Sequence, residues 1–279
     1  MIQFVAKRFL IWIITTVLLF HSQLRAEDRP VHDPILVAHR GLLRHAPENT
    51  LPAFSTCQEM GIGFELDIRT TKDGHLVVIH DNTVGRTTNG PNQSVRKFTL
   101  KELKSLDAGS WFHPRFKGLT VPTLKETFQL IKRLKRDSTI IALNVKDITT
   151  EGERQLVKLV EEYDLFDESF AFDQSAECSQ RLKKLNPKLR IGANVNRQSI
   201  DTRLQEGLLD VFLVTFVPTT EEVQHLHEHG KQAVFNFGGS GAARRNPKVW
   251  NQAKQSGLDG MLTDFPLECR LLWRENQPE

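Results

Sequence analysis

Short apolar segments alternate with longer amphipathic stretches along most of the chain. The apolar segments are rich in Val, Ile, Leu and Phe and are bounded by turn or polar residues, a pattern typical of buried strands. Eight of them precede a helical pattern or the chain's last segment, and they begin near residues 35, 62, 139, 170, 190, 211, 232 and 260. The helical patterns, with apolar positions three or four apart, cover residues 51–60, 124–134, 151–163, 175–185, 200–207, 220–229 and 247–256.

This alternation indicates the fold class. Strands that alternate with helices form a parallel sheet with the helices packed outside it. Eight such units in about 250 residues match the size of a (β/α)8 TIM barrel, so the sequence predicts an α/β protein of this architecture. An open doubly wound sheet is the alternative, because several of the strands are short. In a barrel, functional side chains gather at the carboxyl ends of the strands.

Residues 82–122 interrupt the alternation. They follow a further short apolar segment at 76–79 and contain little regular pattern of their own. Long excursions between regular elements are commonly lids or binding loops, so we predict a small insertion after the second strand region. Its aromatic side chains either contact an acyl chain of a substrate or pack together as the insertion's own core, which is the interpretation we favour. These side chains are Trp111, Phe112 and Phe116.

The N-terminal segment 1–26 differs from the rest. Lys7 and Arg8 precede an apolar run at 9–20, and a small residue closes the segment. A basic start, a short apolar centre and a small residue at the cut are the parts of a secretory signal peptide. The run is short for a bilayer, which takes about 20 residues to span; an uncleaved anchor is the alternative. We therefore predict a signal peptide at 1–26 and an exported chain 27–279, periplasmic or secreted, with no stable membrane span after cleavage.

The charge balance narrows the class of partner. The chain has 37 Lys and Arg residues against 34 Asp and Glu residues, in an otherwise ordinary globular composition. Segment 1–26 contains Lys7, Arg8 and Arg25 and no acidic residue, so it accounts for the whole excess of positive charge. The remaining chain has no net charge. Because nucleic-acid binding depends on a basic face, this balance argues against a nucleic acid as partner.

The three cysteines, Cys57, Cys178 and Cys269, have no metal-site spacing. An exported chain permits one disulfide. Closure of a barrel would bring the first and last helices together, which makes Cys57–Cys269 the pair to consider. Three buried thiols that act as small hydrophobic side chains are the interpretation we favour.

Two acidic residues lie on one face of the second predicted strand. Glu65 and Asp67 are two positions apart, so their side chains point to the same side of the sheet. In a barrel, the alternating apolar residues Phe64, Leu66 and Ile68 would face the helices and the acids would face the interior. Adjacent carboxylates repel each other, and a bound divalent cation removes this repulsion. Oxygen ligands favour Ca2+ or Mg2+ over zinc; a solvated acidic strand face is the alternative.

Four further polar residues lie at the ends of predicted strands. His39 and His80 each follow a strand, and imidazole exchanges protons near neutral pH. Two histidines beside a metal-held phosphate suit acid–base cleavage of a phosphodiester. Arg40 and Lys146 supply positive charge for a phosphate. Salt bridges from these two residues to the acid pair are a structural alternative, and both roles can coexist.

These residues lie in motifs that run through most of the chain after residue 38. The motifs are His39-Arg40-Gly41, Pro47-Glu48-Asn49-Thr50, Glu65-x-Asp67, Thr71-Lys72-Asp73-Gly74, His80-Asp81, Arg86-Thr87-Thr88-Asn89-Gly90, Val121-Pro122-Thr123-Leu124 and Thr263-Asp264-Phe265-Pro266. Together they resemble the glycerophosphodiester phosphodiesterase family. The resemblance implies a TIM barrel with its small insertion at 82–122. It also implies hydrolysis of glycerophosphodiesters to glycerol 3-phosphate and an alcohol, with a divalent cation.

The resemblance also implies a role for each matched residue. By position in the motifs, His39 and His80 are the general acid–base pair, Glu65 and Asp67 are metal ligands, Arg40 and Lys146 bind the substrate phosphate, and Glu48 supports the edge of the site.

Two segments depart from the family pattern. The family usually has a Glu two residues before Lys146, as a third metal carboxylate, and this chain has Asn144 there. An amide oxygen can bind Ca2+ but brings no charge, so we expect a weakened site with Asn144 as third ligand. The run from Phe235 to Gly241 replaces an aromatic-Thr-Val-Asn run, which puts family substrate contacts from that loop in doubt.

Two alternatives to a metal-dependent glycerophosphodiesterase stay open at this point. One is a non-catalytic phosphodiester or lipid-headgroup binding protein, motivated by the amide at position 144. The other is a phosphodiesterase that acts on lysophospholipids. The alcohol, the cation and the assignment of acid and base between the two histidines are not fixed by the sequence.

Overall fold

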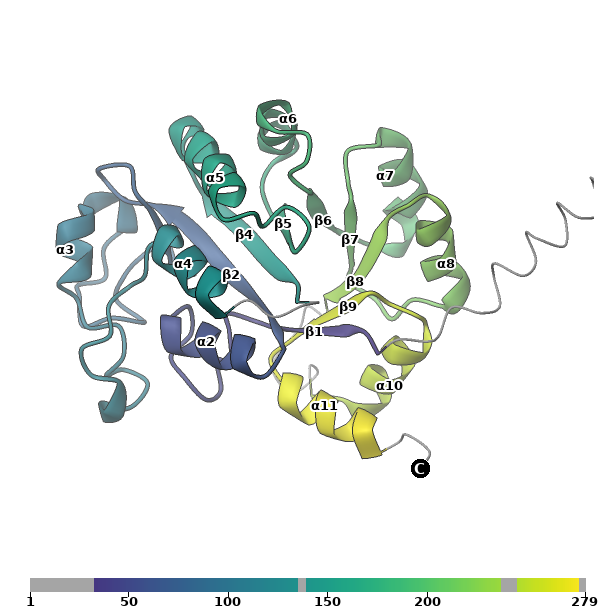
Figure 1. Ribbon diagram of the computed structural model, residues 1–279, viewed down its shortest axis with the longest axis horizontal. Helices are drawn as coiled ribbons and strands as arrows, with labels where there is room; N and C mark the ends of the chain where they lie inside the picture. The colour runs from purple at the N-terminus through teal and green to yellow at the C-terminus, as the bar shows by residue number, and fades with distance from the viewer. Residues whose placement is uncertain (1–32, 135–138, 237–244, 276–279) are drawn as a thin grey trace, which may run out of the picture. The chain divides into compact units, whose positions relative to one another are not determined.

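The computed structural model describes residues 33–134, 139–236 and 245–275 (Figure 1). The predicted signal peptide at 1–26 lies outside these residues, and so does the glycine-rich run that follows residue 236. Within the described part, no helix is both long enough and apolar enough to cross a membrane.

Parallel strands form the centre of the described chain. The strands are β1 (Ile35–Ala38), β2 (Gly63–Thr70), β3 (Leu76–Val78), β4 (Ile141–Asp147), β5 (Ser169–Phe172), β6 (Gly192–Val195), β7 (Val211–Val214), β8 (Gln232–Asn236) and β9 (Gly260–Thr263). Eight of these described strands follow the order β5-β4-β2-β1-β9-β8-β7-β6, while β3 pairs with β2 in antiparallel orientation. A parallel bridge between Ala171 and Ile191 joins the two ends of this order and nearly closes the barrel.

Helices surround the strands (Figure 1). They are α2 (Leu51–Glu59), α4 (Leu124–Leu134), α5 (Thr150–Glu162), α6 (Ala176–Leu185), α7 (Ile200–Glu206), α8 (Thr220–Glu228), α10 (Pro247–Gln255) and α11 (Pro266–Glu275). The predicted (β/α)8 barrel is therefore confirmed, and the open doubly wound sheet is wrong because the bridge between Ala171 and Ile191 joins the two ends of the strand order. Strands β4 and β6 begin two residues later than the apolar pattern suggested, at Ile141 and Gly192.

The alternation along β2 divides its side chains between two environments. Phe64, Leu66 and Ile68 belong to the large apolar cluster that also contains the inner faces of the helices. Phe64 stacks on Phe54 of α2 with ring centroids 4.6 Å apart. The intervening residues of β2 point to the barrel interior, as predicted. A separate apolar cluster fills the rest of that interior, with Val37, Ile140, Ala142, Phe170, Phe172, Val211, Leu213, Val234 and Leu262.

The insertion lies between β3 and α4. It contains η1 (Val95–Lys97), α3 (Leu100–Lys104) and η2 (Pro114–Phe116). Its buried core is aliphatic and is shared with the end of β3: Val77, Ile79, Val84, Val95, Leu103, Ala108 and Val121.

The aromatic side chains of the insertion do not form its core, so that expectation is wrong. Phe112 packs edge-on against Trp111 and Phe116, with ring centroids 5.7 and 5.6 Å away. Trp111, however, is 39% exposed. The reason lies in the loop that carries them, because the carboxylate of Asp107 accepts hydrogen bonds from backbone amides on both sides of the aromatic cluster. The loop is thus held at the surface of the insertion.

The three cysteines are buried and free, as the sequence interpretation favoured. The first and last helices of the barrel are neighbours, because Arg270 of α11 donates hydrogen bonds to the carbonyls of Met60 and Gly61 at the end of α2. Cys57 and Cys269 nevertheless form no disulfide. Burial raises the pKa of Cys57 to about 12, which makes this thiol unreactive near neutral pH.

Candidate active site

Two buried carboxylates lie side by side inside the barrel. Glu65 and Asp67 of β2 are both fully buried. Burial raises the pKa of Glu65 to about 7, and the neighbouring charge of Asp67 adds to this rise. Without a cation, the pair therefore holds a proton close to neutral pH. One oxygen of each carboxylate, Oε1 of Glu65 and Oδ1 of Asp67, is buried and accepts no hydrogen bond.

Asn144 adds a third oxygen to this pair. The Cα atoms of Asn144 and Asp67 are direct partners in the pairing of β4 with β2, so the amide projects beside the carboxylate. Asn144 is 7% exposed, and its Oδ1 also accepts no hydrogen bond. Buried acceptors without donors are rare in proteins. Three of them together fit a divalent cation with a preference for oxygen ligands.

No cluster of three His, Cys, Asp or Glu side chains suited to a metal occurs among residues 33–134, 139–236 and 245–275. A cation at this position would therefore rely on two carboxylates and the amide. The donor set fits Ca2+ or Mg2+ in chemistry but carries one charge fewer than three carboxylates would.

The other oxygens of the pair are tied to the loop after β1. The backbone N–H of Arg40 donates to Glu65 Oε2 at 2.9 Å. Asn49 donates from Nδ2 to Asp67 Oδ2 at 2.8 Å and accepts from the backbone N–H of Asp67 at 3.2 Å. These bonds fix both carboxylates and leave Oε1 of Glu65 and Oδ1 of Asp67 without a hydrogen bond.

This loop adopts a conformation that most residues avoid. Arg40 and Asn49 have positive φ angles of 54° and 56°, in the left-handed region that side chains disfavour. Gly41 continues the turn at φ 78°, and a Cβ there would lie 2.8 Å from the Cβ of Ala53 in α2. The tight packing on α2 and the bonds to the acid pair together hold the loop in place. Strain of this kind is concentrated at functional sites.

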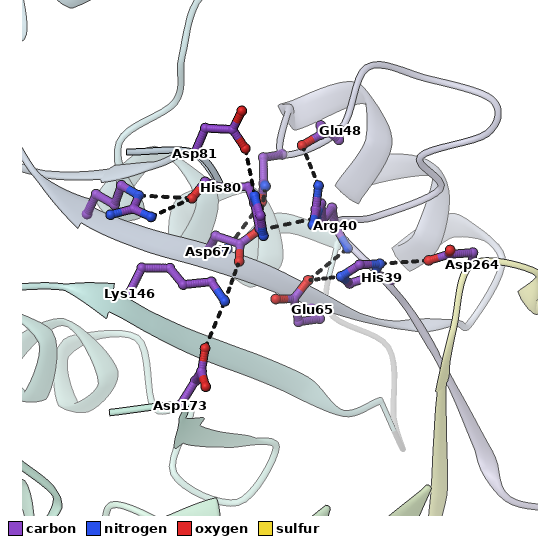
Figure 2. Close-up of polar contacts among 12 residues, drawn as sticks. His39, Arg40, Glu48, Glu65, Asp67, His80, Asp81, Lys146, Asp173 and Asp264 are labelled. Atoms are coloured by element: carbon purple, nitrogen blue, oxygen red, sulfur yellow. Dashed lines mark hydrogen bonds and ion pairs between the residues drawn. The ribbon is translucent and has the colours of Figure 1, made fainter. Parts of the chain in front are cut away.

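His39 lies between two carboxylates (Figure 2). It follows β1 directly, and its Nδ1 lies 2.6 Å from Asp264 Oδ1. Its Nε2 is directed to the other side, 4.0 Å from Glu65 Oε2. An Nδ1–H bond to Asp264 leaves Nε2 as the nitrogen that faces the acid pair. His39 thus presents Nε2 to the buried acid pair.

His80 is held in a similar way from the other wall of the site. Its Nδ1 lies 2.7 Å from Asp81 Oδ1. Its backbone carbonyl accepts two hydrogen bonds from the guanidinium of Arg69, at 2.9 and 2.8 Å. A small cavity beside His80 is also lined by Glu48, Asn49 and Ala108. Both histidines therefore present a ring whose Nδ1 faces a carboxylate.

Lys146 lies between two acids as well (Figure 2). Its Nζ is 2.8 Å from Asp173 Oδ2 and 3.7 Å from Asp67 Oδ1. Arg40 Nε lies 3.7 Å from Asp67 Oδ2. The structural salt bridges considered as an alternative for the two cations therefore exist. They also place both positive charges beside the acid pair.

A chain of charges forms the edge of the site. Arg40 Nη1 donates to Glu48 Oε1 at 2.9 Å, and Arg86 binds both Glu48 and Asp81 through its guanidinium. Burial raises the pKa of Glu48, but hydrogen bonds and charge from Arg86 and Arg40 outweigh it, so the pKa is lowered overall. The hydrogen bond from Arg86 is also the main cause that holds the pKa of Asp81 well below its usual range.

The structure brings all eight residues singled out in the sequence to one edge of the barrel. It also adds residues to which sequence reasoning gave no role: Asn49, Arg69, Asp81, Arg86, Asp173 and Asp264. Asp173 and Asp264 come directly after β5 and β9, so the strand-end rule that found His39 could have found them. Asn49 comes directly before Thr50, the N-cap of α2, and its side chain binds Asp67.

Comparison with known proteins agrees with this arrangement. Residues 39–268 match the glycerophosphoryl diester phosphodiesterase family. A glycerophosphodiester phosphodiesterase of Caldanaerobacter subterraneus subsp. tengcongensis is 36% identical over 242 residues, which cover 83% of this chain and 94% of the relative. The crystal structure of a glycerophosphodiester phosphodiesterase from Agrobacterium tumefaciens matches with a TM-score of 0.69 at 26% identity, over 84% of this chain and 97% of that one.

A phosphodiesterase of Oleispira antarctica, solved in complex with the product sn-glycerol-3-phosphate, has the same fold. Its TM-score is 0.71 at 24% identity, over 87% of this chain and 97% of that one. Fold, site and comparisons together define the class of this chain as a TIM-barrel phosphoric diester hydrolase. The chain belongs to the glycerophosphoryl diester phosphodiesterase family.

Proposed function

We propose that this chain hydrolyses glycerophosphodiesters to glycerol 3-phosphate and an alcohol by acid–base catalysis with His39 and His80. The observation that carries the proposal is the pair of His–Asp contacts at the same edge of the barrel as three buried oxygens that accept no hydrogen bond. Family membership supports the reaction class. A glycerophosphodiester has a phosphate for the cationic side chains and a departing alcohol oxygen that one histidine can protonate.

Positive charge would hold the phosphate. Lys146 and the guanidinium of Arg40 lie beside Asp67, where they balance charge before the substrate binds and contact phosphate oxygens afterwards. Glu48 keeps the Arg40 guanidinium in position through its 2.9 Å hydrogen bond.

Glu65, Asp67 and Asn144 would hold a Ca2+ or Mg2+ ion. Such an ion supplies Lewis-acid stabilisation of the charge that develops on the phosphate oxygens. The Glu65 proton must leave when a cation binds, because the pKa of the free carboxyl is about 7. The backbone N–H of Arg40 then keeps the charged Glu65 in its orientation.

The two histidines would transfer the protons. One imidazole takes the proton of the attacking hydroxyl or water as the new P–O bond forms. The other imidazolium gives a proton to the departing alcohol oxygen as its P–O bond breaks. Asp264 and Asp81 stabilise the positive charge of whichever ring is protonated. Each ring can return to its starting state by exchange with solvent, since His39 and His80 are 17% and 31% exposed.

The products of the wild-type protein test this proposal. Glycerophosphocholine and glycerophosphoethanolamine are incubated with Ca2+ or Mg2+, and the products are identified by 31P NMR. We expect glycerol 3-phosphate and the free alcohol, and losses of at least about 10²-fold in rate for His39→Ala and for His80→Ala. Binding of these compounds without turnover would favour the non-catalytic binding protein that the amide of Asn144 suggests.

A lysophospholipid is the second candidate substrate, and the exposed Trp111 favours it. The indole Nε1–H donates to the carbonyl of Ala108, which lines the cavity beside His80. This bond fixes an exposed aromatic surface close to one wall of the site, where an acyl chain could contact it. Faster release of choline from lysophosphatidylcholine than from glycerophosphocholine, and loss of that preference in Trp111→Ala, would support this substrate.

We also propose export of the mature chain, on the strength of the signal-peptide pattern in segment 1–26. Expression with and without this segment, followed by fractionation and N-terminal sequencing, tests it. Cleavage after Ala26 is the expected result, and a full-length chain in the membrane fraction would identify the segment as an anchor.

A further inference from the structure

Arg86 lies at the centre of the chain of charges at the edge of the site, which connects Arg40 with His80. Its Nε and Nη2 donate to Asp81 at 2.6 and 2.8 Å. Its Nη1 and Nη2 donate to Glu48 at 2.9 and 2.8 Å. One guanidinium therefore binds two carboxylates in a forked geometry, which a lysine cannot reproduce.

Each of these carboxylates has a second partner inside the site. Asp81 Oδ1 receives Arg86 and also lies 2.7 Å from His80 Nδ1. Glu48 Oε1 receives Arg86 and also receives Arg40 Nη1 at 2.9 Å. Arg86 thus contacts the direct partner of the proposed acid–base residue and the direct partner of a proposed phosphate-binding residue, while it belongs itself to the insertion.

The ring of His80 needs this support more than its backbone does. The two bonds from Arg69 to the His80 carbonyl fix the main chain. Asp81 is the next residue in the chain and is 26% exposed, so its side chain has other rotamers available at the surface. Its two bonds to Arg86 select the rotamer that faces His80. Without the guanidinium, Glu48 and Asp81 would lose the positive charge between them and would repel each other.

We propose that Arg86 is a positioning residue that orients His80 through Asp81 and the Arg40 guanidinium through Glu48. The inference rests on the proposed role of His80 in acid–base catalysis. Arg86 itself acts through the two carboxylates, one of which lies beside His80 and the other beside Arg40. It makes the insertion part of the catalytic arrangement, because the orientation of His80 depends on a residue that the insertion supplies.

A second arginine of the insertion provides a matched control. Arg96 of η1 forms a forked pair with Asp147 of β4, at 2.6 and 2.5 Å, and also joins the insertion to the barrel. Arg96 and Arg86 have similar exposure, 38% and 43%. Arg96→Gln therefore removes a comparable link between the insertion and the barrel and leaves the bonds of Asp81 and Glu48 in place. Comparison with Arg86→Gln then separates loss of such a link from loss of the positioning of His80.

The experiment measures kcat and KM on glycerophosphocholine for Arg86→Gln, Arg86→Lys, Arg96→Gln, Asp81→Asn and the double variant Arg86→Gln/Asp81→Asn. We expect Arg86→Gln to lower kcat by about 10- to 100-fold, a part of the effect of a positioned acid or base, with a smaller rise in KM through Arg40. Arg86→Lys restores part of kcat. In the Asp81→Asn background, Arg86→Gln has little further effect on kcat, because both changes disrupt one connection.

Two results would overturn the proposal. The first is a kcat for Arg86→Gln that matches wild type or falls only as much as that of Arg96→Gln. The second is a double variant whose fold-loss of kcat equals the product of the fold-losses of the two single variants, since independent contributions are additive in free energy.

A measurement without substrate separates this proposal from the proposed function. The 15N shifts of the His80 ring report its tautomer in the free protein. We expect a protonated Nδ1 in wild type and in Arg96→Gln, and a mixture of tautomers in Arg86→Gln. An unchanged His80 tautomer in Arg86→Gln overturns the role of Arg86, whereas absence of turnover in wild type with this tautomer change present overturns the proposed reaction alone.

Discussion

Asp264 Oδ1 lies 2.6 Å from His39 Nδ1, although 225 residues separate the two in the chain. The contact follows from closure of the barrel, because β9 pairs with β1 and the backbone N–H of His39 donates to the carbonyl of Thr263 at 3.1 Å. Each residue is the first after its strand. The last strand of the barrel thereby supplies the partner of a histidine that follows the first.

Replacement of Asp264 by Asn should impair catalysis more than folding. The amide can donate to Nδ1 and so favours the wrong tautomer of His39, and it no longer stabilises the imidazolium. We expect kcat for glycerophosphodiester hydrolysis to fall by about 10²-fold or more, with a smaller change in KM.

Asp259→Asn is the matched control, because Asp259 binds His227 at 2.9 Å in another His–Asp pair. Asp259 directly precedes β9, whereas Asp264 directly follows it, so the two pairs lie at opposite ends of this strand. Asp259→Asn should lower the melting temperature and leave kcat close to wild type. Equal losses of kcat in the two variants would mean that Asp264 acts only through the stability of the barrel.

Replacement of Lys146 by Met should weaken phosphate binding. Its Nζ lies 2.8 Å from Asp173 and 3.7 Å from Asp67, so the charge is already at the acid pair when the substrate arrives. We expect kcat/KM to fall by about 10²-fold, measured from initial rates. Lys125→Met serves as control, because that lysine pairs with Glu162 in an exposed contact of 3.8 Å. A kcat/KM within twofold of wild type for Lys146→Met would exclude the phosphate role.

The stability of the cation-free protein should depend on the protonation of Glu65. Burial raises the pKa of this carboxyl from 4.5 to about 7. The folded state therefore holds the Glu65 proton more tightly than the unfolded state does. The stabilisation from neutral Glu65 is fully present below pH 4.5 and is lost as the pH rises through about 7.

A divalent cation favours the charged form of Glu65, so the stabilisation that a cation provides should grow over the same range. Melting curves with EDTA and with Ca2+ or Mg2+, recorded between pH 5.5 and 8.5 in steps of about half a unit, test this. Glu65→Gln should remove the pH dependence of the difference. A cation effect that is constant across this range in wild type would contradict it.

Replacement of Asn144 by Glu should strengthen the cation site. Asn144 lies opposite Asp67 in the strand pairing, so the new carboxylate would join the existing pair and add a third charge. We expect the Kd for Ca2+ or Mg2+ from calorimetry to fall by about tenfold or more, and Asn144→Leu to raise it by a similar factor. If Asn144→Glu left the Kd unchanged while the protein stayed folded, the amide oxygen would not be a ligand.

The arrangement of the barrel and half of the site follow from local sequence patterns. The period of two along β2 places Glu65 and Asp67 on the inner face, and the strand-end rule places His39 and Lys146 at the same edge of the barrel. These are short-range signals. Together with the alternation of strands and helices, they are sufficient to place these residues in the barrel.

The partners of these residues depend on features that local patterns do not encode. Asn49 reaches Asp67 because its φ is 56°, a conformation that the preceding Pro-Glu dipeptide does not predict. Arg86 reaches Glu48 across 38 residues because the insertion folds back over the loop after β1. The aromatic cluster at Trp111 was expected to be buried, and it is not, since Asp107 fixes its loop at the surface.

The most direct test of cation-dependent hydrolysis is the rate of glycerol 3-phosphate release from glycerophosphocholine by the chelated wild-type protein, before and after Ca2+ or Mg2+ is restored. Asp67→Asn is measured beside it, because it removes one of the two buried charges. We predict release that is at least about 10²-fold slower after chelation, full recovery with saturating cation, and a higher cation requirement for Asp67→Asn. Equal release with and without the cation would contradict it.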